Sequence, residues 1–259
     1  IGVLVVLIAN MFVLSANANA TVAVGDIVFV KMPTSTAPAE LSILQGTSVT
    51  DLVSLESNDT QVNPAVSPTG SKIAFNSRLS GRQASEIYTV NNDGTSQSEL
   101  TTSPSTNTSG GTRHTDWFPS WCNTSSLVFW RQYGVNSYQT EFSNYTAPRV
   151  YKVYADGSGE AKVSQDDSKS YNEPKCSPDG SKIAFSRTNS ATGYNEIWYM
   201  NVNGSSETLV PSQPSRDNTS PTWGSSGRLY FNSGWYGGVS VLDWWGSNSV
   251  DVRIFTAQA

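Results

Sequence analysis

The sequence predicts an all-β fold of about five β-propeller blades, each of four strands, preceded by one apolar α-helix. One phrase occurs twice, at residues 63–101 and 173–209. A three-residue apolar core recurs, and neighbouring copies start 46 to 56 residues apart, close to the roughly 40–50 residues of one blade. Hairpin dipeptides such as Asn203-Gly204 separate the strands. The apolar cores lie at residues 27–29, 73–75, 127–129, 183–185 and 229–231.

Each copy is expected to contribute four strands in the same order. The inner strand opens with a proline, followed two residues later by a core-type side chain, as in Pro174 and Cys176. A Ser-Pro-Asp-Gly turn at 177–180 leads into the apolar core, which is the second strand. The third strand alternates or is aromatic, and the fourth is more polar. Third strands are expected at 86–90, 149–153 and 196–200, and fourth strands at 99–101, 162–164 and 207–209.

The two end copies are weaker. The first keeps the register through residues 41–44 but has no proline in its expected inner strand, 21–24. The last ends in an expected outer strand at 250–255.

The phrase at 173–209 resembles the TolB-type β-propeller repeat, whose pattern is roughly P-x-[apolar]-SPDG-x-[KR]-I-A-F, then [ED]-I-Y, D-G and L-T. The copy at 63–101 matches with Thr69 in place of Asp, and the copies near 120 and 222 are degenerate. The resemblance covers about residues 23–259 and implies radially packed sheets. We therefore expect a helix at 1–22 and a propeller at 23–259. The family pattern implies six blades in TolB, whereas this sequence contains five copies of the repeat.

Composition limits the partners. The chain is 14% charged with a net charge of −5 and has no basic patch, which argues against nucleic acid and anionic membrane surfaces. Such a surface is typical of an exported protein solvated by hydroxyls, amides or glycans. Seven sequons are candidate N-glycosylation sites: Asn19, Asn58, Asn107, Asn123, Asn144, Asn203 and Asn218.

The two cysteines, Cys122 and Cys176, fall on expected inner strands of neighbouring blades. In an exported protein they could form a disulfide. The alternative is two small buried hydrophobic residues, because Cys176 aligns with Trp121 rather than with Cys122.

Residues 1–25 carry no charged side chain. One interpretation is a secretory signal peptide cleaved after a small-x-small site at 18–20. The favoured one is a retained helix that resembles the N-terminus of archaeal type IV pilins and archaellins, held in the membrane before it bundles with copies of itself. Residues 1–9 carry that resemblance. The assembly face would comprise Ile1, Val3, Leu4, Val6, Leu7, Ile8, Phe12 and Leu14.

Catalytic chemistry is not predicted. The one histidine, His114, lies in a Gly/Thr-rich segment beside Asp116 and is expected to be solvated. No G-x-S-x-G elbow, zinc-type Cys/His spacing or phosphate loop occurs. We expect no enzyme, no metal site and no cofactor, with calcium in an Asp-lined loop as the secondary alternative.

Four aromatic residues fall outside the strand pattern. They are interpreted either as a sugar-stacking or subunit-contact surface or as packing where the last blade meets the first. They are Trp235, Tyr236, Trp244 and Trp245.

Two functions follow from these patterns. The first is a structural subunit of an extracellular, cell-surface filament, with helices at its axis and glycosylated propellers outside, so that its partner is itself. The alternative is a secreted or periplasmic TolB-like propeller that binds a protein or glycan, with residues 1–20 as signal peptide or anchor.

Overall fold

The structure is a computed structural model that describes residues 25–31, 38–55, 62–78, 84–103, 112–136, 142–143, 146–211, 213, 215–234 and 253–258. Every regular element in these ranges is a β-strand, and none of them contains a helix able to span a membrane. The predicted helix at 1–22 and the predicted inner strand at 21–24 lie outside the described residues.

The strands form five antiparallel sheets that follow one another along the chain. The first sheet is β1 (Ile27–Lys31), β2 (Glu40–Gln45) and β3 (Ser48–Ser54). The second is β4 (Ala65–Val66), β5 (Lys72–Ser77), β6 (Glu86–Asn91) and β7 (Ser98–Glu99). The third is β8 (Thr112–Trp121), β9 (Ser126–Asn136), β11 (Arg149–Tyr154) and β12 (Ala161–Lys162), with β10 (Phe142–Ser143) beside the end of β9.

The remaining two sheets complete the described fold. The fourth is β13 (Asn172–Cys176), β14 (Lys182–Thr188), β15 (Asn195–Asn201) and β16 (Thr208–Leu209). The fifth is β17 (Asp217–Trp223), β18 (Arg228–Gly234) and β19 (Arg253–Gln258).

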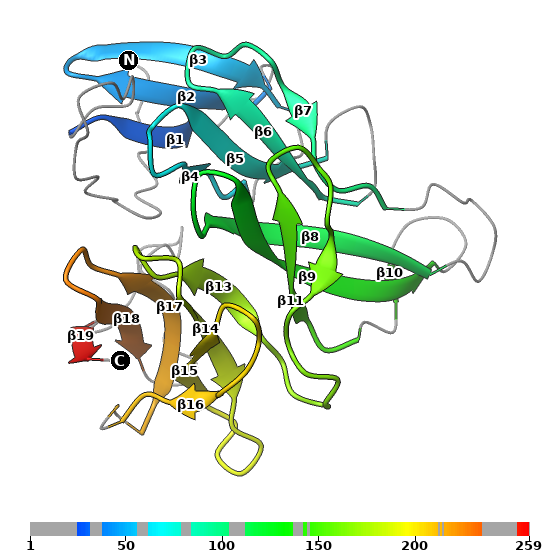
Figure 1. Cartoon of the computed structure of the whole chain (residues 1–259), viewed down its shortest axis with the longest axis vertical. Coiled ribbons are helices and arrows are strands. Elements are labelled where there is room, and N and C mark those ends of the chain that lie inside the picture. Colours follow the sequence, from blue (N-terminus) through cyan, green and yellow to red (C-terminus); the bar gives the residue numbers. More distant parts are fainter. Residues whose placement is uncertain are drawn as a thin grey trace, which may run out of the picture.

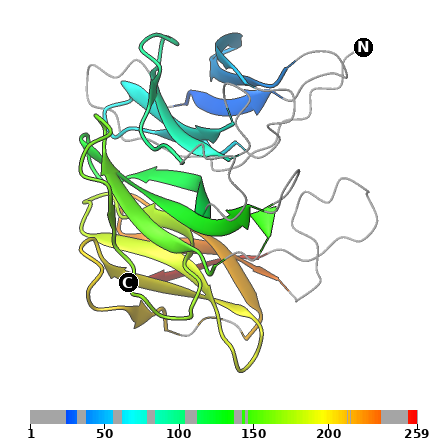
Figure 2. The ribbon, with the colours of Figure 1, turned by 90° about the vertical axis from the view of Figure 1, so that its right-hand side faces the viewer.

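The sheets are arranged as consecutive propeller blades. Inner strand β8 packs against β4 and β13, and β13 packs against β17. Figure 1 shows the blades fanning from the first sheet at the top to the fifth at the lower left, and Figure 2 shows the same succession from the side. The prediction of a multi-blade all-β propeller is therefore confirmed.

Within the described residues the sheets have three, four, five, four and three strands, and the second and fourth have the four strands expected of each blade. The fourth strands that do form are only two residues long. The C-terminal strand is described from Arg253, and residues 250–252 of the expected outer strand lie outside the described residues. It is the third described strand of its sheet, because it pairs with β18.

Four apolar clusters hold consecutive sheets together, one cluster between each pair. Within the repeated core of the second sheet, Ile73 and Phe75 pack toward the first sheet, whereas Ala74 packs toward the third. The fourth sheet repeats this arrangement with Ile183, Phe185 and Ala184. The alternation follows from the two-residue period of a strand, so the cores of the second, third and fourth sheets each join three sheets.

A bulge recurs in three inner strands at the residue before the proline. Phe118, Glu173 and Ser220 have positive φ angles of 54°, 52° and 53°, and strand pairing shifts register at each of them. Proline cannot donate a ladder hydrogen bond, so a bulge accommodates it. In sheets three and five, the tryptophan two residues after the proline then donates to the previous inner strand. Trp121 Nε1 lies 3.0 Å from the Ala65 carbonyl oxygen, and Trp223 Nε1 lies 2.9 Å from that of Lys175.

The hairpin glycines contact the preceding sheet. Gly204 has a φ of +85°, and a Cβ on it would lie 2.0 Å from the Val163 carbonyl oxygen. Gly94 approaches Leu52 of the first sheet in the same way. These positions therefore need glycine both for the turn and for close packing between sheets.

Cys122 and Cys176 are joined by a disulfide with a Cα–Cα distance of 4.9 Å. Cys176 ends β13, but Cys122 follows the end of β8 and is not on an inner strand as predicted. Because Cys122 lies in the turn after β8, its side chain need not follow the alternation of strand side chains between the two faces of the sheet. The bond therefore connects the third sheet to the fourth.

We predict that replacing both cysteines by serine lowers the free energy of unfolding by about 2–4 kcal/mol, because the bridge restricts the unfolded chain. Urea denaturation with and without dithiothreitol measures this change. The double variant should be insensitive to the reductant. A wild-type midpoint that is unchanged after complete reduction would contradict the prediction.

Candidate functional site

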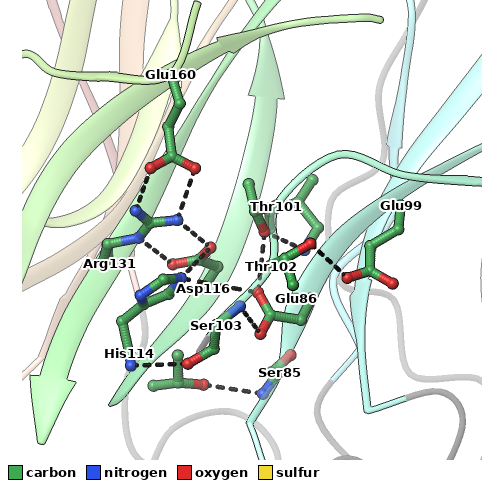
Figure 3. Close-up of polar contacts among 12 residues, drawn as sticks. Ser85, Glu86, Glu99, Thr101, Thr102, Ser103, His114, Asp116, Arg131 and Glu160 are labelled. Carbon is green, nitrogen blue, oxygen red and sulfur yellow. Dashed lines mark hydrogen bonds and ion pairs between the residues drawn. The ribbon is translucent and has the colours of Figure 1, made fainter. Parts of the chain in front are cut away.

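A group of charged side chains, all buried except the exposed Glu160, lies between the second and third sheets, and we call it the polar centre. It comprises Glu86 at the start of β6, His114 and Asp116 on β8, Arg131 on β9, and Glu160 just before β12 (Figure 3). The side chains of Glu86 and Asp116 are 0% exposed, that of Arg131 is 2% and that of His114 is 8%. Buried charges at this density need specific partners.

Arg131 is the cation of the polar centre. Its Nε and one terminal nitrogen each donate to Asp116 at 2.7 Å, a bidentate arrangement. Its terminal nitrogens also donate to Glu160 at 2.5 and 3.0 Å. The guanidinium carbon lies 4.7 Å from the ring centre of Tyr151 and 5.3 Å from that of Phe129. Two carboxylates and two rings thus fix this side chain.

Glu86 is held by the segment after β7. The Ser103 backbone N–H donates to its Oε1 at 2.6 Å, and the Thr101 hydroxyl donates to its Oε2 at 3.1 Å. Burial and, second, the negative charge of Asp116 raise the pKa of Glu86 to about 8. Burial also raises the pKa of Asp116, although its hydrogen bonds from Arg131 oppose this.

His114 completes the polar centre. Its backbone N–H donates to Ser103 Oγ at 3.0 Å, and its ring packs edge-on against Tyr133. Its Nε2 lies 3.7 Å from Asp116 Oδ2 and 3.9 Å from Glu86 Oε2, and it has no hydrogen-bond partner. Burial, followed by the charge of Arg131, lowers the pKa of His114 to about 4. The ring is therefore neutral at pH 7.

The prediction of a solvated loop histidine is wrong. Residues 112–121 form one strand that pairs with β9. This pairing places the His114 side chain beside Glu86 of the second sheet. The Gly/Thr-rich composition that suggested a loop belongs in part to this strand.

The fourth sheet contains a related arrangement. Arg187 pairs with Glu207 at 2.6 Å and lies over the rings of Tyr171, Trp198 and Phe185. Tyr171 also donates its hydroxyl to Glu207 at 2.7 Å. In the repeat, Arg187 corresponds to Arg131, since each is four residues after the start of its apolar core.

The polar centre is a specialised version of this repeated unit. Asp116 stands three residues before Pro119, where the fourth sheet has Tyr171 three residues before Pro174. A carboxylate thus replaces a phenol. The sequence analysis did not identify Arg131, Glu160 or Glu86, although aligning the copies beyond their apolar cores would have paired the two arginines and the two glutamates.

The arrangement holds charge rather than presenting groups to a large substrate. Asp116 and Glu160 bond the guanidinium of Arg131, and Glu86 is the third carboxyl group of the centre. The side chains of Glu86, His114 and Asp116 are at least nine-tenths buried. The carboxyl groups outnumber the guanidinium by two, so the centre favours binding a proton or a small cation.

The other predicted site residues are placed as follows. The sequons at Asn123 and Asn203 are exposed in turns, where each side chain accepts from a serine two residues on. Asn218 is buried and its amide donates to Gln213, so this position cannot carry a glycan in the folded chain. The remaining candidates lie outside the described residues: Asn19, Asn58, Asn107, Asn144, Trp235, Tyr236, Trp244 and Trp245.

A second feature is a group of half-buried rings, which we call the aromatic cluster: Trp117, Phe118 and Trp130. Trp130 packs edge-on against both others, with ring centres 6.4 and 6.3 Å away. Trp130 Nε1 donates to Asn172 of the fourth sheet at 3.2 Å. The rings of Trp117 and Trp130 are only partly covered. The bulge at Phe118 brings its ring beside the other two.

No protein-family model matches the sequence, and a search of curated proteins finds no match. Solved structures do match. TolB from Acinetobacter baumannii superimposes with a TM-score of 0.61 at 16% identity, over 90% of this chain and 52% of that chain. A putative TolB from Agrobacterium tumefaciens gives 0.54 at 19% identity, over 83% and 72%. A puromycin-hydrolyzing peptidase from Mycobacterium tuberculosis gives 0.58 at 13% identity, over 90% and 36%.

These similarities define the fold as a TolB-like β-propeller. The chain spans about half the length of the Acinetobacter baumannii TolB chain, 52% of it. The neighbours include a peptidase as well as TolB proteins, so the fold alone does not separate a binding protein from part of an enzyme.

We predict that Arg131→Met destabilises the protein by about 3–5 kcal/mol, because Asp116 would remain buried without its cation. Arg187→Met is the matched control, since it unpairs only Glu207, whose side chain is partly exposed. Chemical denaturation of both variants measures the difference. An equal or smaller loss in Arg131→Met would contradict the importance of the polar centre.

The polar centre also predicts a pH dependence. Between pH 6.5 and 8 the folded state keeps a proton on Glu86 that the unfolded state has lost, so stability should fall by roughly 1–2 kcal/mol over this range. Below pH 6.5 the lowered pKa of His114 acts in the opposite direction, because there the unfolded state binds the extra proton. Urea denaturation in a metal chelator measures this profile, and Glu86→Gln should remove the decline. A decline that persists in Glu86→Gln would contradict the assignment.

Proposed function

We propose that the chain is an exported β-propeller module that binds a protein partner through the aromatic cluster. The observation that carries this proposal is the group of half-buried rings Trp117, Phe118 and Trp130 beside the bulge of β8. Aromatic side chains that pair an apolar ring with a polar atom dominate the binding energy of many interfaces.

Two further observations support export. The disulfide between Cys122 and Cys176 is typical of proteins that fold in an oxidising compartment. The surface is poor in charge, and the sequons at Asn123 and Asn203 are exposed. A periplasmic or extracellular location fits both, with N-glycans at those two asparagines as part of the proposal.

The structural neighbours are compatible with a binding module. TolB proteins are among them, and so is a chain from a nidogen/laminin complex, at a TM-score of 0.54 and 10% identity. The chain from the nidogen/laminin structure thus comes from a protein–protein complex. The peptidase neighbour keeps an enzymatic role as the competing proposal.

The filament hypothesis depends on residues 1–22, which lie outside the described residues. No feature of the described propeller favours self-assembly over binding. The binding module therefore replaces the filament as the main proposal.

We predict that Trp117→Ala weakens binding to an exported partner at least ~10-fold, as expected for a central interface residue. The full chain would be immobilised, challenged with the exported protein fraction of its source, and the bound partner quantified by titration. Tyr154→Ala is the control, because Tyr154 is an exposed aromatic residue, 45% accessible, on another part of the third sheet.

Equal binding by the wild type and Trp117→Ala would reject the aromatic cluster as the docking site. A glycan array run in parallel tests the alternative ligand. A glycan signal that Trp117→Ala abolishes, without a protein partner, would assign the cluster to carbohydrate instead.

A further inference from the structure

We propose that Glu86, His114 and Asp116 form a binding site for a divalent transition-metal ion, with Zn²⁺ the simplest occupant, that ties the second sheet to the third. The site is separate from the aromatic cluster, and the proposal does not depend on the docking function. Glu86 comes from β6, whereas His114 and Asp116 come from β8, so one ion would bridge two blades (Figure 3).

The ligand atoms are already close together. One ligand atom from each of the three side chains lies within 4.8 Å of the other two. His114 Nε2 is 3.7 Å from Asp116 Oδ2 and 3.9 Å from Glu86 Oε2. Bonds of about 2.1 Å to a tetrahedral ion place neighbouring ligand atoms ~3.4 Å apart. His114 Nε2 would therefore move a few tenths of an ångström closer to each carboxylate oxygen, and the two carboxylate oxygens would close from a separation of at most 4.8 Å.

An unpartnered nitrogen points independently to a ligand. His114 Nε2 is buried, has no hydrogen-bond partner, and belongs to a side chain only 8% exposed. Nearly all buried polar atoms in folded proteins are satisfied. A metal ion between Nε2 and the two carboxylates would use its lone pair, because histidine binds metals as the neutral imidazole.

The charges in the polar centre fit a divalent cation. Glu86, Asp116 and Glu160 carry three negative charges when ionised, and Arg131 supplies one positive charge. A doubly charged ion that displaces the proton from Glu86 brings this sum to zero. Arg131 does not exclude the ion, because a carboxylate has lone pairs for more than one partner.

The surroundings already orient the ligands. Ser103 and Thr101 hydrogen-bond Glu86, Arg131 fixes Asp116, and the Ser103 hydroxyl accepts the backbone N–H of His114. Such outer contacts hold metal ligands in productive positions. The combination of one imidazole with two carboxylates favours zinc and similar ions over calcium, which prefers oxygen ligands alone.

The experiment uses the full chain. The protein is unfolded in urea with a chelator and refolded with Zn²⁺, so that burial of the site does not prevent loading. Metal content is then measured by mass spectrometry after dialysis, and thermal unfolding is compared with chelator-treated protein. We expect about one tightly held Zn²⁺ per chain and a Tm at least ~5 °C higher with the ion.

His114→Phe is the decisive variant, because phenylalanine keeps an aromatic ring against Tyr133 but removes both ring nitrogens, including the ligand Nε2. It should be at least as stable as the wild type in chelator, yet lose both the bound Zn²⁺ and the Tm increase. Glu207→Gln, in the related unit of the fourth sheet, is the matched control and should keep both.

Wild-type protein that holds no Zn²⁺ after refolding would overturn the proposal. So would a His114→Phe variant that retains the ion and the Tm increase. If His114→Phe fails to fold, Glu86→Gln is tested in its place. Loss of the bound Zn²⁺ and of the Tm increase would support the proposal, and retention of both would overturn it.

Discussion

Packing of one sheet against the next is the constraint on which this structure depends. Each blade is apolar on both faces, so a sheet cannot be stable without a neighbour. The three-residue core meets this need with large residues directed backward and a smaller one directed forward, as Phe75 and Ala74 illustrate. Glycines at the hairpins and tryptophans on the inner strands then fix how closely consecutive sheets approach.

The polar centre shows how a repeated framework acquires a distinct property at one position. Arginine, glutamate and aromatic rings recur in the third and fourth sheets, where they form an ion pair packed on rings. The third sheet adds Asp116 and His114, and the second sheet contributes Glu86. Few differences between the copies thus separate a simple ion pair from a buried cluster of carboxyl groups and an imidazole. The neighbouring unit, with Tyr171, retains the simpler form.

Much of the fold could be predicted from the sequence, because strand period, turn residues and repeat spacing are local signals. The cores at 73–75 and 183–185 and the hairpin at Gly204 lie where these signals placed them. The candidate site could not be predicted in this way. Glu86 and His114 are brought together by packing between two blades, and the composition around His114 resembled a loop. The bulge at Phe118 could not be predicted from the sequence either, because it depends on how β8 pairs with the distant strand β9.

The bridge between Cys122 and Cys176 also governs how the molecule would respond to mechanical force. Tension applied to the two ends of the chain would pass through the sulfur–sulfur bond and bypass the 54-residue separation it spans. About 190 Å of extended polypeptide would then be shielded from stretching. The polar centre and the aromatic cluster draw most of their residues from β8 and β9, and the shielded segment contains all of β9. Force on the chain ends would therefore act on the sheets outside this segment before it acts on β9.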